Sequence, residues 1–146
     1  MKKALLLFLL SSAVFVTTAQ LRKIPADVTE AFASRYPHAT RVEWKDKLHY
    51  FEATFELNGS IIAADFSSKG EWQSSERKLN FDDLPDEVKD GFQKSKYADR
   101  QRNAVYELQE LGQPLQYRIN VQKSGLQKKN LYFDTNGKLL KEVIAL

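Results

Sequence analysis

Two blocks of this sequence occur twice, in the same order along the chain. The block IPADVTEAF, which begins at Ile24, returns as LPDEVKDGF at Leu84, a shift of 60 residues. The block FSSKG, which begins at Phe66, returns as FDTNG at Phe133, a shift of 67 residues. Because both matches keep their order and nearly their separation, they indicate one supersecondary unit that is used twice.

Each unit is predicted to begin with a helix. Pro25 and Pro85 suit the first helical position, where the missing N–H has no partner to lose. Val28, Phe32 and Tyr36 follow at intervals of four residues, and the second copy repeats the spacing of the first two. This spacing places apolar side chains on one side of a helix, so we expect both helices to pack on a sheet.

An alternating strand and a tight turn follow the first helix. Residues 49–57 alternate between apolar and polar types, which predicts a strand with one buried face. The dipeptide Asn58-Gly59 is the strongest signal for a two-residue type I′ hairpin turn. The register that this turn imposes pairs Phe55 with Ile62, and it keeps apolar residues opposite each other further from the turn.

The second copy contains a similar hairpin with a longer loop. Residues 115–121 alternate in the same way. A three-residue loop at 124–126 pairs Ile119 with Leu131, whereas a two-residue loop would place Ile119 opposite Asn130. The longer loop is favoured because it keeps apolar residues together. Its extra residue also accounts for the growth of the shift between the two copies.

Shorter strands are expected on both sides of each hairpin. They precede the hairpins at 41–45 and 103–110, and they follow them around Trp72 and Leu139. Each unit is therefore a helix followed by about four antiparallel strands, and the fold class is α+β. Each sheet would carry a helix on one face and leave a mixed polar and aromatic face open.

The domain limits follow from this organisation. Residues 20–80 form the first helix-plus-sheet repeat and residues 81–146 the second. We expect one folded body over 20–146, because a unit of about 60 residues has little core of its own. The sequence contains no cysteine, so burial alone must stabilise this body.

Residues 1–19 have the pattern of a secretory signal peptide. Lys2 and Lys3 form a basic start, residues 4–16 are mostly apolar, and the small residues at 17–19 suit cleavage before Gln20. The apolar stretch is shorter than the roughly 20 residues that a membrane span needs. We therefore expect an exported protein, periplasmic or secreted, that is soluble and has no membrane span after cleavage.

The charge balance argues against nucleic acid as a partner. The full chain has a net charge of +3, but without Lys2 and Lys3 there are 20 basic and 19 acidic side chains. Nucleic-acid binding needs clustered Lys and Arg that replace counterions. The nearest approaches to a cluster, at 100–102 and 128–129, are short and have polar neighbours.

These motifs resemble the PepSY-like, β-lactamase-inhibitor-like family of small exported bacterial proteins. The segments that carry the resemblance are IPADVTEAFASRYPHATRVEW, FEATFELNGSIIAADFSSKGEW and their second copies, from about Ile24 to Glu142. The resemblance implies tandem helix-plus-sheet units whose combined sheets offer a concave face. In the namesake inhibitors such a face clamps a secreted enzyme, and the broader PepSY group is linked with restraining peptidases. No inhibitory residue can be transferred to this chain.

The sequence shows no catalytic, cofactor-binding or metal-binding constellation. His38 and His49 are the only histidines, and they lack the close spacing of a metal-binding pair. The serine pairs at 67–68 and 74–75 lack a Gly-x-Ser-x-Gly setting. With six glycines the chain also has no glycine-rich phosphate loop. We predict that the protein is not an enzyme.

Four residues are candidates for partner binding. They belong to the residue types that are enriched in interface hot spots: Trp44, Tyr50, Trp72 and Arg118. Tyr50 alternates with the predicted core residue Phe51, so it should point away from the core. Trp44 and Trp72 leave two interpretations open, because large aromatic side chains also fill cores.

Two functions from different classes remain. The first is a binding module whose sheet face engages an exported protein, with a hydrolase or a peptidase as the candidate target. It predicts an exposed aromatic patch and no deep polar pocket. The second is a carrier of a small molecule or lipid between the two repeats, which needs an enclosed apolar cavity. The sequence favours the first.

Overall fold

The computed structural model describes residues 23–123 and 127–145. The predicted signal peptide, 1–19, lies outside the described residues, as does the loop 124–126. In the described part no helix is both long enough and apolar enough to cross a membrane.

Two helices cover the sheet, and a proline directly precedes each. Helix α1 spans Ala26–Arg35 and helix α2 spans Asp86–Gln93. The prolines therefore lie one position before the predicted one, and the carbonyl oxygens of Pro25 and Pro85 accept N–H bonds from the first turns at 3.0–3.2 Å. Each helix buries the valine and the phenylalanine of its predicted stripe.

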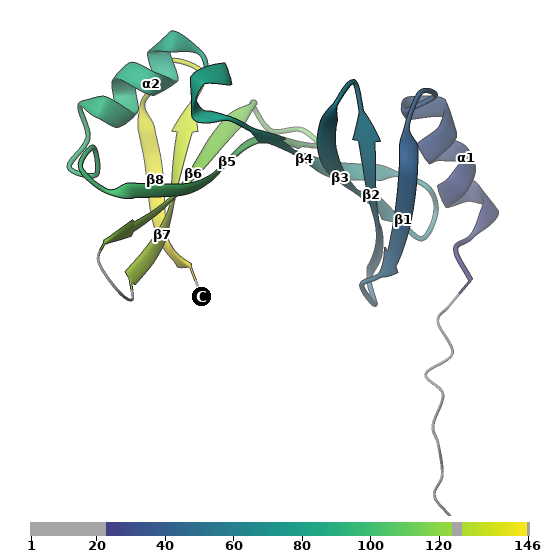
Figure 1. The fold of residues 1–146 in the computed structure, drawn as a ribbon. Helices are drawn as coiled ribbons and strands as arrows, with labels where there is room; N and C mark the ends of the chain where they lie inside the picture. Colours follow the sequence, from purple (N-terminus) through teal and green to yellow (C-terminus); the bar gives the residue numbers. More distant parts are fainter. Residues whose placement is uncertain (1–22, 124–126, 146) are drawn as a thin grey trace, which may run out of the picture.

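Eight strands pair in chain order in one antiparallel sheet (Figure 1). In the first half they are β1 (Thr40–Asp46), β2 (Tyr50–Leu57), β3 (Ser60–Ser67) and β4 (Trp72–Leu79). A short 3-10 turn, Phe81–Asp83, leads from β4 to α2. In the second half they are β5 (Gln101–Glu110), β6 (Gln116–Lys123), β7 (Gln127–Asp134) and β8 (Leu139–Ala145).

The expectation of a separate sheet in each half is wrong, because β4 pairs with β5 over six residue pairs, from Ser74–Glu110 to Leu79–Val105. The alternation in these two strands continues from one half to the other, so their backbone groups bond each other and leave no edge between the halves. The structure is thus an α+β fold with one eight-stranded sheet and two helices.

The predicted registers of both hairpins are confirmed. Phe55 pairs with Ile62 across the Asn58-Gly59 turn, whose two residues have φ angles of 51° and 76°. Positive φ at both positions is what a type I′ turn requires. Ile119 pairs with Leu131, as expected for the longer loop.

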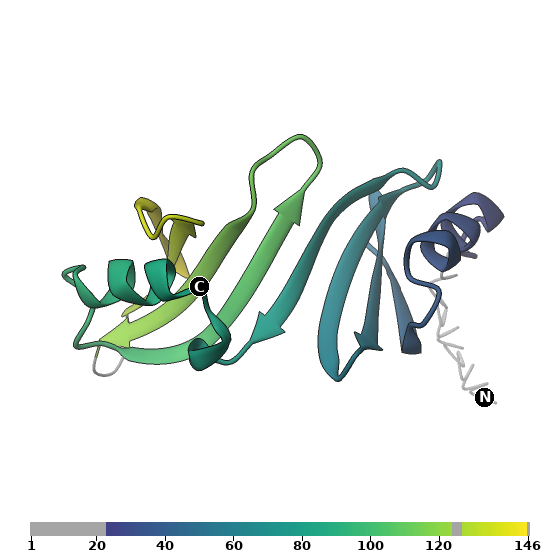
Figure 2. The ribbon, with the colours of Figure 1, turned by 90° about the horizontal axis from the view of Figure 1, so that it is seen from above.

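Both helices lie on the same face of the sheet. Ile62 packs in the core under α1 and pairs with Arg77 of β4, while two residues further along β4 Leu79 packs in the core under α2. Residues two apart on a strand share a face, so both cores lie on one side. Figures 1 and 2 show the sheet bending between the halves, with the helices on the outer side of the arch.

The turn after each hairpin approaches a helix closely. Gly70 and Gly137 have φ angles of 80° and 78°, a conformation that glycine adopts without strain. A Cβ atom on Gly70 would lie 2.5 Å from the carbonyl oxygen of Asp27 in α1, and one on Gly137 would lie 1.9 Å from that of Glu87 in α2. The glycine of the repeated FSSKG/FDTNG block therefore lets the turn rest against the first turn of its helix.

Candidate binding face

The sheet has one face without helices, here called the open face. Side chains on it point to the inner side of the arch in Figure 1. The strand registers place on it, among others, Tyr50, Glu52, Asp65, Glu76, Tyr106, Leu108, Arg118 and Tyr132. None of these side chains is fully exposed, because neighbours on the curved sheet cover part of each. The opposite side is called the helix-covered face.

The structure brings two of the four predicted site residues onto the open face. Tyr50 and Arg118 lie there, as expected from their alternation with core residues. Trp44 and Trp72 lie on the helix-covered face instead. This separates the two tryptophans from the other two candidates by the thickness of the sheet.

Trp44 packs under helix α1. It pairs with Ala53 of the core, and its ring lies edge-on to Phe32 with the centroids 5.3 Å apart. The ring of Phe66 is 6.3 Å away. Trp44 therefore fills the flank of the first core, the interpretation in which a large aromatic side chain serves packing.

Trp72 also borders the first core. It pairs with Phe66, and the guanidinium of Arg35 lies 3.9 Å from its ring centroid. Its indole Nε1 is buried and donates to no acceptor within the described residues. Trp72 is thus half-buried between the sheet and the end of α1.

Arg118 takes part in a fixed arrangement on the open face. Its Nη1 and Nη2 donate to Oε1 and Oε2 of Glu76 at 2.7 and 2.8 Å. Its guanidinium also lies 4.5 Å from the ring centroid of Tyr106. Such a two-point contact fixes the orientation of the guanidinium as well as its position.

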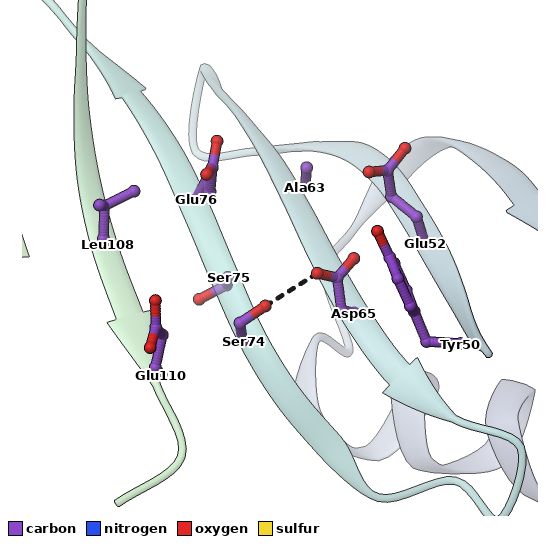
Figure 3. A pocket seen from close by; sticks show the side chains of 9 residues that line it. All are labelled: Tyr50, Glu52, Ala63, Asp65, Ser74, Ser75, Glu76, Leu108 and Glu110. Carbon is purple, nitrogen blue, oxygen red and sulfur yellow. Dashed lines mark hydrogen bonds between the residues drawn. The ribbon is translucent and has the colours of Figure 1, made fainter. Parts of the chain in front are cut away.

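Beside this arrangement the open face has a hollow, here called the Tyr50 hollow (Figure 3). Its volume is about 200 Å³, and its lining includes Tyr50, Glu52, Ala63, Asp65, Ser74, Glu76, Leu108 and Glu110. The side chain of Leu108, only 7% exposed, supplies an apolar surface. The hydroxyl of Ser74 donates to Oδ2 of Asp65 at 2.8 Å, the dashed contact in Figure 3.

The environment of Asp65 disfavours its charged form. Burial raises the pKa of the Asp65 carboxyl above its usual value, and the nearby charges of Glu52 and Glu76 act in the same direction. The hydrogen bond from Ser74 opposes this effect without cancelling it. The hollow therefore contains a carboxylate that gains from a nearby positive charge.

Sequence reasoning missed three residues of this face: Asp65, Tyr106 and Tyr132. The signal for Tyr132 was available, because the predicted register of the second hairpin places it opposite Arg118. The amino group of Lys141 lies 4.4 Å from the ring centroid of Tyr132. Asp65 and Tyr106 needed the pairing of β4 with its neighbours, which no local pattern showed.

The exposed aromatic patch predicted for a binding module is not present in the form expected. Over residues 23–123 and 127–145 the exposed large apolar side chains are aliphatic, such as Ile61 and Ile144. The tyrosines of the open face are half-buried among charged groups. His38 and His49 are both exposed, and the described residues contain no group of His, Cys, Asp and Glu arranged to hold a metal ion.

The comparisons with known proteins agree with this fold. Residues 49–141 match the model of the family described as "Putative beta-lactamase-inhibitor-like, PepSY-like", and the chain belongs to that family. This confirms the resemblance found in the sequence. No curated protein matches the chain.

Several solved structures share the fold. A BLIP-like protein from Bacteroides fragilis is 27% identical, with a TM-score of 0.79 over 84% of this chain and 86% of that one. A DUF2874 family protein from Bacteroides ovatus is 26% identical, with a TM-score of 0.80 over 84% and 88%. A Bacteroides eggerthii protein described as "putative periplasmic" is 24% identical, with a TM-score of 0.79 over 84% and 89%. Membership of an inhibitor-like family indicates a non-catalytic binding module.

Proposed function

We propose that the protein is an exported binding module that engages a periplasmic or secreted protein with its open face. The observation that carries this proposal is a broad sheet face that both helices leave uncovered. On it lie Tyr50, Tyr106, Tyr132 and Arg118, residue types that recur in interface hot spots. Trp44 and Trp72 are left out of the proposed interface because both pack on the other face.

A hydrolase or a peptidase is the proposed class of partner. The support is the family description, which names β-lactamase inhibitors, and the B. fragilis structure, which is called BLIP-like. An arched sheet can surround a convex part of an enzyme and exclude its substrate without any chemistry of its own. Export is supported by the pattern of residues 1–19 and by the description of the B. eggerthii protein.

We also propose that the two halves are copies of one unit, 20–80 and 81–146, in one folded body. The support is the order of elements, in which a helix precedes four strands in each half. The contact of Gly70 with Asp27 and that of Gly137 with Glu87 occur at matching places in the two halves. Such a duplication would explain why both helices cover the same face.

The carrier function receives no support from the hollows of the described part. A carrier needs an enclosed apolar cavity. The Tyr50 hollow is open to solvent and contains four carboxyl groups. A second hollow, on the helix-covered face between the halves, is lined by charged side chains that include Arg35, Arg77 and Glu107.

Photo-crosslinking through single cysteines tests the proposed function. Because the chain has no cysteine, one introduced residue is a unique attachment point. Thr54→Cys and Asn120→Cys place a crosslinker on the open face, and Glu30→Cys places it on the exposed side of α1 as the control. We expect one defined protein from the envelope or secreted fraction to be captured through the first two variants only.

The captured protein is then purified and assayed with and without the wild-type chain. Loss of its hydrolase or peptidase activity at a stoichiometric ratio is the expected result. Capture through Glu30→Cys alone, or equally through all three positions, would contradict the role of the open face.

A further inference from the structure

The open face places cations over its tyrosine rings. The guanidinium of Arg118 lies over Tyr106 while Glu76 holds it from the side. The amino group of Lys141 lies over Tyr132. Attraction between a cation and the electron-rich face of an aromatic ring favours both contacts. In the second half of the open face, the chain thus supplies its own cations.

Tyr50 is the third tyrosine of this face and differs from the other two. Over residues 23–123 and 127–145, no Lys or Arg of the chain lies over its ring. Its neighbour Glu52 is 3.9 Å from Lys45 and 3.6 Å from Lys47, two cations from the β1 side of the hollow. Tyr50 therefore has the carboxylates of the Arg118 arrangement close by but no cation of this chain on its ring.

The carboxyl groups on the far side of the hollow are also uncompensated. Glu76 is paired with Arg118. Asp65 accepts a hydrogen bond from a neutral hydroxyl, and Glu110 is exposed next to it across Ser74. Neither Asp65 nor Glu110 has an ion pair among the described residues. The negative charge that remains lies between Tyr50 and Leu108.

The shape of the hollow distinguishes between kinds of cation. Its carboxyl groups are not arranged to hold a metal ion. Leu108 and Ala63 offer apolar surface beside the carboxylates, and the space of about 200 Å³ exceeds that of a single ion. An apolar stem with a charged end, as in lysine and arginine, matches this combination.

We propose that the partner of the open face inserts a lysine or arginine side chain into the Tyr50 hollow. The stem lies against Tyr50 and Leu108, and the charged end reaches Asp65 and Glu110. This inference rests on the proposed function, since it names the chemistry that the open face selects in its protein partner. The raised pKa of Asp65 agrees with it, because a cation there would offset the cost of ionising a half-buried carboxyl.

Amide NMR of the wild-type protein with small probes tests the hollow directly. The probes are N-acetyl-lysine methylamide, its arginine analogue, and N-acetyl-norleucine methylamide as the uncharged match for lysine. We expect the two cationic probes to give saturable shifts of the Tyr50, Asp65 and Ser74 amides. Equal shifts with the norleucine probe, or no saturable shift with either cationic probe, would overturn the proposal.

Two charge-neutralising variants test the same site with the crosslinked partner. Asp65→Asn keeps an acceptor for Ser74, so the fold should persist, and we expect about tenfold weaker affinity for the partner and for the lysine probe. Glu43→Gln removes the same charge from the open face outside the hollow and should change either affinity less than about twofold. Equal effects of both variants would show long-range attraction instead of a local site.

The two proposals fail in different ways. If Thr54→Cys and Asn120→Cys capture a partner that Asp65→Asn binds as tightly as wild type, only the lysine or arginine inference is wrong. If no partner is captured through the open face, the proposed function is wrong, whatever the probes show.

Discussion

Arg118 and Glu76 join two strands that are not neighbours in the sheet. Glu76 belongs to β4 and Arg118 to β6, so their contact at 2.7 and 2.8 Å passes over β5. On the helix-covered face Arg77 makes a similar two-point contact with Glu107 at 3.1 and 2.9 Å. The boundary between the two cores thus carries an oriented ion pair on each face.

We expect the Arg118–Glu76 contact to stabilise the junction measurably. The side chain of Arg118 is only 18% exposed, so water screens this pair less than a surface pair. A double-mutant cycle of Arg118→Ala and Glu76→Ala, followed by urea unfolding, should give a coupling energy of about 1 kcal/mol. The cycle for Arg41 and Glu56, where Arg41 is 83% exposed, is the control and should give a coupling energy near zero.

Substitution of Gly137 should destabilise the fold strongly. Gly137→Ala forces a positive φ on alanine and pushes its Cβ against the carbonyl of Glu87. We expect a loss of about 3 kcal/mol in the free energy of unfolding, from backbone strain and overpacking together. Gly112→Ala is the matched control, because Gly112 also has a positive φ but no atom within 4 Å of the added Cβ. It should lose only about 1 kcal/mol, and an equal loss in both variants would contradict the close-approach argument.

Glu142 should make stability depend on acid pH. Hydrogen bonds from Tyr97 and Lys129 lower the pKa of the Glu142 carboxyl to about 2, and the charges of Lys129 and Lys96 act in the same direction. A carboxyl whose pKa is depressed in the folded state stabilises that state above its unfolded pKa, and the contribution is lost as pH falls. The contribution of Glu142 should therefore be complete above about pH 5 and disappear toward pH 2.

Thermal unfolding of wild type and Glu142→Gln over this pH range checks the expectation. The two proteins should differ most at neutral pH and converge on acidification. Lys123→Gln, which changes an exposed charge at the end of β6, is the control for a general effect of net charge. A constant difference between wild type and Glu142→Gln at all pH values would show that the role of Glu142 is not ionic.

Asp65 should have the opposite pH dependence. Because its pKa is raised in the folded state, its contribution to stability is fully present below the unfolded pKa and is lost as pH rises through the folded pKa. Asp65→Asn should thus raise the melting temperature at pH 7, and its advantage should shrink toward pH 3. A variant that is more stable but binds its partner more weakly is the pattern expected of a functional residue. A lower melting temperature at pH 7 would contradict the burial argument.

The candidate site could be predicted only in part. Alternation along β2 and β6 was enough to place Tyr50 and Arg118 on the open face. Trp44 and Trp72 could not be placed, because tryptophan is both a core residue and an interface residue. Their outcome depended on Phe32 and Arg35 of α1, which are distant along the chain and reach these rings only in the folded state.

Local patterns determined the elements of this protein. The spacing of Val28 and Phe32, the Asn58-Gly59 turn and the apolar pairing of Ile119 with Leu131 depend on residues near one another, so the sequence by itself defined helices, hairpins and registers. The tertiary structure decided how the halves combine. Pairing of β4 with β5 is made by backbone groups that every residue carries, and no side-chain pattern announces it. That pairing merges two sheets into one, puts both helices on one side and brings Asp65, Glu76 and Leu108 around the hollow beside Tyr50.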